Sequence, residues 1–454
     1  MRKSICILVV LALTAVSSRA QSFQQAFFLD GYSLAYRYNP AIQNEGAFLS
    51  VGQLESQTLN NVGMASFLYP RNGEVVTGLH SSVSAQELLG NLQPDNYLSG
   101  HLNVNLFSYG WRQGENYHTL EGNIRAHYGA SIPREIFAVL KHGPGHSVHE
   151  MGGLHLWGSG YGEVAYGYSR RLSSWITVGA RAKLLLGVES LDYNMTRLDV
   201  SASEEAVTAS VEANLDLTSR WATIPADEDG YYRLLDLRLL SSNNRWKGPS
   251  GGGLAVDLGV LLTPAEGLTL SASVVDLGGI FWYFSNAGKS QGTTTFTGLD
   301  GLTLEEIKGD GLSEKFNELK EEFMQTLKIK ALDSRMSFAA VPFQVNLGAK
   351  YELPFYRPLS VGATGNFLFQ RGMNYREGRV ALAWNPRSWL GMSADIGTGT
   401  YGMVYGLALN AAFKRIRFTA AWNNGFGGTL GYSGVPLRAN NKFITLGLAY
   451  DLGK

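Results

Sequence analysis

The chain has 454 residues, with 38 basic and 38 acidic side chains and a formal net charge of zero. This balance gives no electrostatic reason to expect binding to nucleic acid. The chain is rich in glycine (54 residues) and aromatic side chains (11%), and its mean hydropathy is only −0.06. Such a composition is typical of a transmembrane β-barrel, in which polar lumen residues and long loops dilute the residues that face lipid.

Residues 1–20 have the pattern of a secretory signal peptide. Arg2 and Lys3 precede an apolar stretch, and Ser18-Arg19-Ala20 fits a cleavage site before Gln21. The only cysteine, Cys6, lies within this signal, so we expect a mature chain without disulfide bonds or a lipid anchor. No later stretch offers about 18 uninterrupted apolar residues, and no helical membrane span is therefore expected.

Residues 21–46 are predicted to form an N-terminal hatch inside a barrel that comprises residues 47–454. The segment carries too many aromatic side chains for a solvated tail: Phe23, Phe27, Phe28, Tyr32, Tyr36 and Tyr38. Asn39-Pro40-Ala41 predicts a turn into the barrel wall, because proline ends a helix and fixes its backbone.

The rest of the chain repeats runs of about ten residues in which apolar and polar side chains alternate, the period of a β-strand. In 119–128, for example, Leu120 and Ile124 share one face while Glu121 and Arg125 share the other. The runs predict fourteen antiparallel strands, at 47–57, 98–110, 117–129, 160–170, 174–189, 254–263, 267–279, 342–352, 359–369, 376–385, 390–398, 402–413, 415–424 and 441–452. Residues 190–218 also alternate and form either an external hairpin or two further wall strands, so sixteen strands is the alternative.

The predicted connections are alternately short and long, as expected for short periplasmic turns and long external loops. The long set is 58–97, 130–159, 190–253, 280–341 and 424–440. Aromatic residues near the short turns predict an interfacial girdle: Trp111, Trp175, Tyr351, Phe355, Tyr356, Trp384, Trp389 and Phe413. In the last strand, Thr445, Gly447, Tyr450 and Leu452 resemble the insertion signal read by the barrel assembly machinery, although the chain ends in Lys454.

The alternation also predicts which side chains face the lumen. The candidate lumen-lining or ligand-binding residues are Glu163, Arg181, Lys183, Asp257, Lys350 and Arg417. A Lys or Arg that faced lipid at the midplane would cost about 2–4 kcal/mol, so these charges belong inside. They either satisfy one another or tune a permeation path. Inward glycines, including Gly179, Gly259, Gly348 and Gly406, leave volume for a plug or a ligand.

Two loops are predicted to contain helices, at 133–141 and at 312–330, where Leu312, Phe316, Leu319, Phe323 and Leu327 form one apolar stripe.

The histidines 142, 146, 149 and 155 are dense enough to consider a metal site, but Gly143-Pro144-Gly145 interrupts them, and we expect a polar surface loop and no metal or cofactor. Gly248-Pro249-Ser250-Gly251-Gly252 matches the G-x-S-x-G pattern but enters a strand, so we expect no hydrolase and no enzyme.

The N-terminal segment, the Asn-Pro-Ala turn and the fourteen strands resemble the long-chain fatty acid transporter (FadL-type) superfamily. The runs 32–41, 165–170 and 178–187, with Asp257-Leu258-Gly259 and Asp276-Leu277-Gly278, resemble an uncharacterised outer-membrane barrel family of Bacteroidota. The resemblance implies a monomeric barrel in the outer membrane, in contact with its lipid, that takes up a small hydrophobic or amphipathic molecule passively. The alternative is a non-transporting barrel that docks or assembles secreted or surface proteins.

Overall fold

The computed structural model describes residues 24–143, 148–203, 206–220, 222–233, 238–239, 248–296, 328–424 and 440–453. The predicted signal peptide, the first three residues of the predicted hatch, residues 312–327 of the second predicted helix and most of the 424–440 loop lie outside these ranges. Among the described residues, every helix is too short or too polar to cross a membrane.

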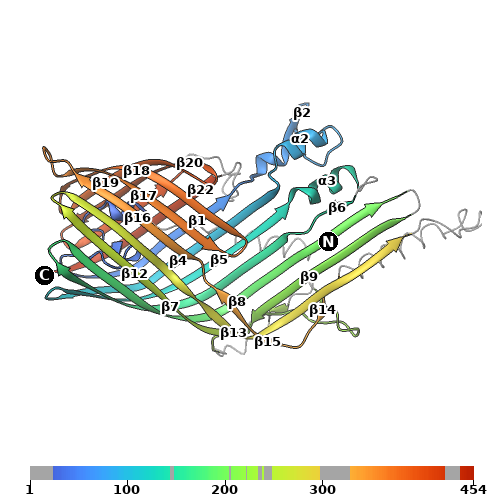
Figure 1. Ribbon diagram of the computed structural model, residues 1–454, viewed down its shortest axis with the longest axis horizontal. Coiled ribbons are helices and arrows are strands. Elements are labelled where there is room, and N and C mark those ends of the chain that lie inside the picture. The colour runs from blue at the N-terminus through green and yellow to red at the C-terminus, as the bar shows by residue number, and fades with distance from the viewer. Residues whose placement is uncertain are drawn as a thin grey trace, which may run out of the picture.

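The structure is dominated by one antiparallel sheet of eighteen strands within the described residues. Pairing passes from strand to neighbouring strand and returns from β22 to β1, so the sheet closes into a ring (Figure 1). In ring order its strands are β1 (Ala47–Asn60), β4 (Asp95–Gln113), β5 (Asn116–Pro133), β7 (Leu154–Ser173), β8 (Ile176–Ala202), β12 (Gly251–Ala265), β13 (Leu268–Phe296), β16 (Phe343–Glu352), β17 (Leu359–Gln370), β18 (Met373–Arg387), β19 (Leu390–Gly399), β20 (Gly402–Phe413), β21 (Ile416–Asn423) and β22 (Asn440–Gly453). Closure leaves neither β1 nor β22 as an edge strand.

Each strand range predicted from the alternation overlaps one strand of this ring. The prediction was wrong about where β8 and β13 end. They continue to residues 202 and 296, so parts of the predicted loops 190–253 and 280–341 are strand. Both strands can continue because β9 (Val207–Ser219) pairs with the far half of each and satisfies their backbone groups.

Within 190–218, residues 190–202 therefore belong to β8 and residues 207–218 to β9, and the two strands pair as a hairpin, the first of the two predicted alternatives. In the ring, β12 pairs with β8 on one side and with β13 on the other. Beyond the first residue of β12, β9 pairs with these same two strands instead. The segment thus lengthens one side of the ring without widening it. We call β9 and the parts of β8 and β13 that pair with it the distal extension. The opposite end of the ring, where the C-terminus lies, is the proximal end (Figure 1). The sheet also includes β6 (His149–Glu150), β14 (Lys330–Ala331) and β15 (Arg335–Ala340).

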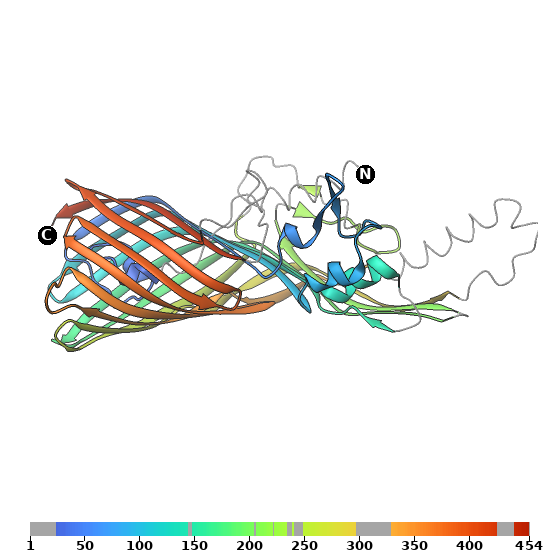
Figure 2. The same ribbon diagram turned by 90° about the horizontal axis from the view of Figure 1, so that it is seen from above.

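A small subdomain covers one side of the extension (Figure 2). It contains the hairpin of β2 (Leu68–Arg71) and β3 (Glu74–Thr77), the helix α2 (Ala85–Gly90), and α3 (Arg134–His142). The hydroxyl of Ser84 accepts a hydrogen bond from the N–H of Glu87 and caps α2. The short helix predicted at 133–141 is confirmed, since α3 spans Arg134–His142. Its Phe137 packs against Phe67.

Residues 24–46 lie inside the ring near its proximal end (Figure 2). The segment forms two short 3-10 helices, η1 (Gln24–Phe27) and η2 (Ala35–Arg37). Its apolar side chains are buried in one cluster with wall residues; they are Phe27, Phe28, Leu29, Tyr32, Leu34, Tyr36 and Tyr38, and they pack with Phe48, Tyr117 and Phe443. The hydrophobic core at the proximal end of the ring is therefore built around the N-terminal segment.

Inward glycines of the wall make room for this segment. A Cβ on Gly179 would lie 2.2 Å from the carbonyl oxygen of Pro40, and one on Gly259 would lie 2.0 Å from Oδ1 of Asn39. A Cβ on Gly348 would likewise lie 2.9 Å from the ring of Phe27, and one on Gly406 would lie 2.2 Å from Nε2 of Gln25. Asn39 also donates from Nδ2 to the carbonyl oxygen of Val260 at 3.0 Å, which fixes the predicted turn against the wall.

This fit predicts the effect of adding one methyl group. Gly179→Ala places Cβ against the Pro40 backbone, which cannot move without undocking the turn, and overpacking of this kind costs about 1–3 kcal/mol. We expect residues 24–46 to become sensitive to protease while the ring still forms, as judged by its altered gel mobility on heating. Gly378→Ala is the control, because a Cβ there meets nothing within 4 Å. Equal protease resistance of both variants would contradict this packing.

Candidate functional site

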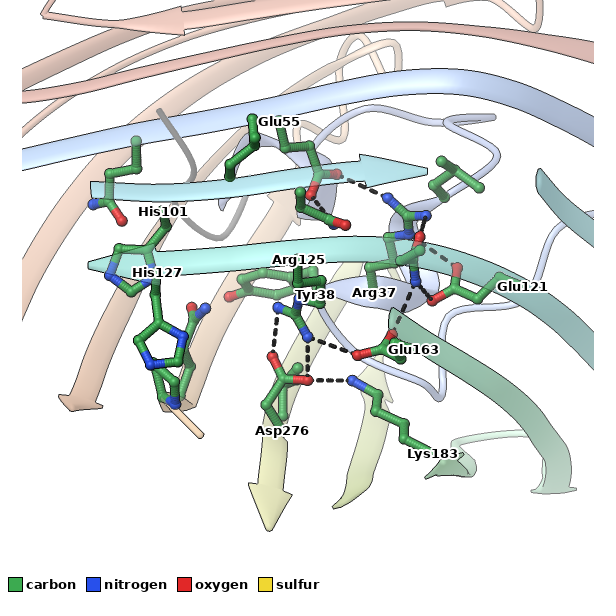
Figure 3. Close-up of a pocket in the computed structure, with 18 of the residues that line it drawn as sticks. Arg37, Tyr38, Glu55, His101, Glu121, Arg125, His127, Glu163, Lys183 and Asp276 are labelled. Atoms are coloured by element: carbon green, nitrogen blue, oxygen red, sulfur yellow. Dashed lines mark hydrogen bonds and ion pairs between the residues drawn. The ribbon is translucent and has the colours of Figure 1, made fainter. Parts of the chain in front are cut away.

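Nine charged side chains converge inside the ring, immediately distal to the N-terminal segment. Figure 3 labels seven of them, without Arg181 and Asp257. Period-2 alternation on neighbouring strands turns the eight wall residues inward. We call this set the charge cluster: Arg37 from η2, Glu55 on β1, Glu121 and Arg125 on β5, Glu163 on β7, Arg181 and Lys183 on β8, Asp257 on β12 and Asp276 on β13.

Arg37 connects the N-terminal segment to the wall. Its Nη1 lies 3.1 Å from Oε1 of Glu55, and its Nε lies 3.0 Å from Oε2 of Glu121. The hydroxyl of Tyr36 donates to the same Glu121 oxygen at 2.7 Å. Burial lowers the pKa of the Arg37 guanidinium, but the charges of Glu121 and Glu55 outweigh it and raise this pKa above its usual value. Arg37 is therefore a permanent cation between two wall carboxylates.

The remaining cations each bridge two carboxylates. Arg181 pairs with Glu121 and, at 2.8 Å, with Oδ2 of Asp257. Lys183 lies 2.7 Å from Oδ1 of Asp257 and also contacts Asp276. Arg125 binds both oxygens of Asp276, at 2.7 and 2.9 Å.

Glu163 completes the cluster, with its Oε2 2.9 Å from Nη1 of Arg125. The cluster contains four cations and five carboxylates, so its formal charge is −1. Burying charges is costly unless each is paired and hydrogen-bonded, and here every carboxylate contacts at least one cation.

The two Asp-Leu-Gly motifs noted in the sequence meet in this cluster. The N–H of Asp276 donates to Oδ1 of Asp257 at 2.7 Å instead of joining the strand ladder. Asp276 has a φ of +66°, which is rare for a residue other than glycine. Pairing of β13 accordingly changes partner here, from β16 at Val275 to β15 at Gly279.

A cavity of about 80 Å³ adjoins the cluster. The N-terminal segment forms its proximal boundary through Tyr32, Leu34 and Tyr38. Rings from three neighbouring strands form one side: His101 stacks on His127 with centroids 6.1 Å apart, and His127 meets Tyr161 edge-on at 6.2 Å. The cavity is lined by both polar and apolar side chains, the latter including Val275 and Leu368.

The turn between β17 and β18 closes the lumen beyond this cavity. It reaches strands that are not its neighbours in the ring: Arg371 pairs with Asp192 of β8, and Gln370 donates to Ser99 of β4 at 3.3 Å. A Cβ on Gly372 would lie 2.5 Å from the ring of Trp157. Trp157, Leu368, Met373 and Tyr375 form a buried cluster there. The cavity thus has one closure on each side.

Four of the six predicted site residues, Glu163, Arg181, Lys183 and Asp257, lie in the charge cluster. The other two lie apart from it. Lys350 pairs with Asp30 of the N-terminal segment at 3.0 Å. Arg417 pairs with Asp451 at 3.1 Å. Within the described part of the chain, no three His, Cys, Asp or Glu side chains are grouped to hold a metal ion.

Five members of the cluster were not among the candidate site residues predicted from the sequence: Arg37, Glu55, Glu121, Arg125 and Asp276. The signals for three were present, because Glu121 and Arg125 lie on the polar face of 119–128 and Asp276 repeats the motif of Asp257. A second polar group lies outside the predicted candidate site residues. Arg379 pairs with Glu377 at 3.0 Å and with Asp395 at 2.7 Å, and Gln25 donates to Asp395 at 2.7 Å.

The contacts of Arg37 predict how firmly the N-terminal segment is held. Arg37→Met keeps the aliphatic length but leaves Glu121 and Glu55 without this cation, a loss that costs about 3 kcal/mol for a buried pair. Hydrogen exchange in residues 24–46 should then accelerate about 100-fold. Lys350→Met is the control, because its partner Asp30 has a side chain 57% exposed and such pairs contribute about 0–1 kcal/mol. Equal exchange in the two variants would rule out Arg37 as the main anchor.

Comparison with solved structures finds similar chains at low sequence identity. The chain is similar to the toluene transporter TodX of P. putida (10% identity, TM-score 0.41, 96% of each chain covered). It is also similar to a FadL homologue of Pseudomonas aeruginosa (12%, 0.42, 96% of this chain and 99% of that one). A third similar structure is the toluene transporter TbuX of Ralstonia pickettii (11%, 0.42, 92% of each).

No curated protein matches the chain. A family model does match, over residues 40–423, and its description is a family of unknown function, DUF5723. This range covers most of the ring and begins at the proline of the turn that docks on Gly179. The chain belongs to the DUF5723 family.

Proposed function

We propose that the fourteen strands of the ring form the wall of a barrel in the bacterial outer membrane. Its outer surface is apolar at the positions that alternate with the buried charges: Leu184 is 48% exposed, whereas Lys183 is 3% exposed. This is the arrangement that lipid on one side and a polar lumen on the other require. Trp175, Trp389 and Phe413 are exposed near the proximal turns, as an interfacial girdle would be.

In this proposal residues 1–20 are a cleaved signal peptide and residues 21–46 are a hatch. The strands that continue into the distal extension are far longer than the roughly 9–11 residues that cross a membrane; β8 has 27 residues and β13 has 29. The extension then projects from the outer surface of the cell, and the hatch faces the periplasm.

The function we propose for this barrel is passive uptake of a small amphipathic molecule. The observation that carries it is the cavity between the N-terminal segment on the proximal side and the β17–β18 turn on the distal side. A barrel that served only as a scaffold has no need of a space between two plugs. Because polar and apolar side chains share the lining, a purely hydrophobic ligand fits this cavity less well than an amphipathic one.

Docking of secreted or surface proteins is the second candidate. The observation that favours it is the distal subdomain, where Val75, Leu79 and Leu140 are each more than half exposed. A protein that co-purifies with the barrel in a fixed ratio, with no small molecule bound, would support docking over uptake.

The distal closure provides a direct test of uptake. Asp192→Cys and Arg371→Cys together remove the ion pair across the mouth and introduce two thiols that a short reducible cross-linker can join. The described residues contain no other cysteine, and Cys6 lies in the predicted signal. In proteoliposomes followed by light scattering, we expect erythritol to enter faster through this variant than through the wild type.

Cross-linking should return the rate to that of vesicles without protein, and reduction should restore it. Single-cysteine variants treated in the same way are the controls. Uptake is excluded if neither the wild type nor the un-linked variant admits erythritol faster than empty vesicles.

A further inference from the structure

We infer that the outer face of the wall binds one lipid with an anionic phosphate headgroup, taken from the outer leaflet of the membrane. The acyl chains of this lipid lie in a groove over β16, β17, β18 and β19, and its phosphate lies at Arg376. The inference rests on the proposed placement of the wall in a membrane, and not on uptake through the lumen.

Two adjoining hollows lie on the outer face of these strands, with volumes of about 780 and 930 Å³. Both are lined by Ala349 and Ala363, which are opposite each other in the pairing of β16 with β17. The two hollows therefore form one surface, which we call the outer groove. Three charged residues of its lining, Lys350, Glu377 and Asp395, are buried and pair inside the ring.

The middle of the outer groove has little side-chain volume. Gly365 and Gly378 are opposite each other on β17 and β18. Among the described residues, a Cβ on Gly378 would meet nothing within 4 Å, and one on Gly365 would meet no atom closer than 3.9 Å. The inward Gly179, in contrast, receives the backbone of the N-terminal segment. Because a void forfeits dispersion contacts, the outward pair of glycines favours an apolar group from outside the chain.

A cation lies at the distal end of the outer groove. Arg376 is opposite Phe367 of β17, and it is two residues from Gly378 on the same face of β18. Its side chain is exposed, and its guanidinium has no ion-pair partner among the described residues.

The position of Arg376 along β18 fits a membrane surface. Trp384, on the same face, is eight residues nearer the proximal turn, about 26 Å along the strand. A tilted strand of this length covers most of an apolar band of about 25 Å. Arg376 and Trp384 therefore lie near opposite interfaces, and an arginine that faces lipid is tolerated there far better than at the midplane.

The groove and the cation together define the chemistry of the occupant. Exposed aliphatic side chains such as Val380 and Leu382 border the groove and suit an acyl chain. A guanidinium binds a phosphate through paired, charge-assisted hydrogen bonds. A lipid supplies both groups in this order, with its phosphate at the membrane surface and its chains below it.

A second copy of the barrel fits this surface less well. A two-fold axis along the membrane normal would place the Arg376 of both copies at the same depth, so that two unpaired cations would approach each other. In the proposed orientation the distal interface is the outer one, and the lipid therefore comes from the outer leaflet.

Four probes test this assignment: dimyristoyl phosphatidylglycerol, dimyristoyl phosphatidylcholine, dimyristoylglycerol and glycerol 3-phosphate. The first three have the same chains, but only phosphatidylglycerol has a net negative headgroup, and glycerol 3-phosphate has the phosphate without chains. Native mass spectrometry of the whole mature protein in detergent counts the molecules that remain bound. We expect one molecule of phosphatidylglycerol, bound at least tenfold more tightly than each of the other three probes.

Two variants remove the two parts of the site. Arg376→Gln removes the cation and Gly378→Leu fills the middle of the groove, so each should weaken phosphatidylglycerol binding at least tenfold. Arg171→Gln and Gly162→Leu are the matched controls on β7, outside the groove. Arg171 is exposed, and a Cβ on Gly162 would come no closer than 3.9 Å to its neighbours. Arg376→Gln carries the test alone if the leucine variant does not form the ring, as judged by gel mobility on heating.

The assignment is overturned if the three lipids bind equally, if glycerol 3-phosphate binds as tightly as the lipid, or if the controls weaken binding as much as the variants. A dimer without bound lipid that Gly378→Leu dissociates would also overturn it, because the groove would then be an interface between two copies.

Failure of this inference is distinguishable from failure of the proposed function. If alkaline carbonate extracts the protein from vesicles, the wall does not span the membrane and both proposals are wrong. If the protein resists extraction and admits erythritol but selects no lipid, only the lipid site is wrong. If it selects phosphatidylglycerol but does not admit erythritol, only passive uptake is wrong.

Discussion

The pairing of buried charges between the N-terminal segment and the wall is the interaction on which the rest of the structure depends. Arg37 reaches Glu55 and Glu121 from inside the ring, and Arg181 continues the chain of pairs to Asp257. Without the segment, two wall carboxylates would lose a cation, and the inward glycines that receive its backbone would line an empty space. The ring and the segment inside it are therefore one folding unit. The segment pairs with buried wall carboxylates and fills the space beside the inward glycines, and the wall buries the apolar side chains of the segment.

The same pairing accounts for the departure of β13 from regular strand geometry. Asp276 adopts a positive φ and directs both its N–H and its carboxylate toward the cluster, where Asp257, Lys183 and Arg125 engage them. Strained backbone of this kind persists only where the surroundings over-determine it. The change of partner from β16 to β15 lies beside the cavity, so the wall departs from a regular ladder next to this space.

Much of this fold could be predicted from the sequence because alternation of side chains reports directly on a two-sided wall. The ranges of the ring strands and the inward position of Arg181 and Lys183 follow from that period alone. The length of β8 was predicted only as one of two alternatives for residues 190–218, since it depends on β9 pairing with it after a turn that the period does not encode. Nor could the contact of Arg37 with Glu121, which joins residues 84 positions apart across the lumen; alternation shows which face a residue takes but not what lies opposite.

The central claim is that the N-terminal segment is held in one position inside the ring. Pulsed electron spin resonance between labels at Asp30, on the segment, and Arg357, in the turn between β16 and β17, tests it directly in intact cells. Both side chains are more than half exposed, so labels can be attached without disturbing the cluster. The account predicts a single narrow distance distribution. A broad distribution, or one that matches free chain beyond the proximal end, would contradict it.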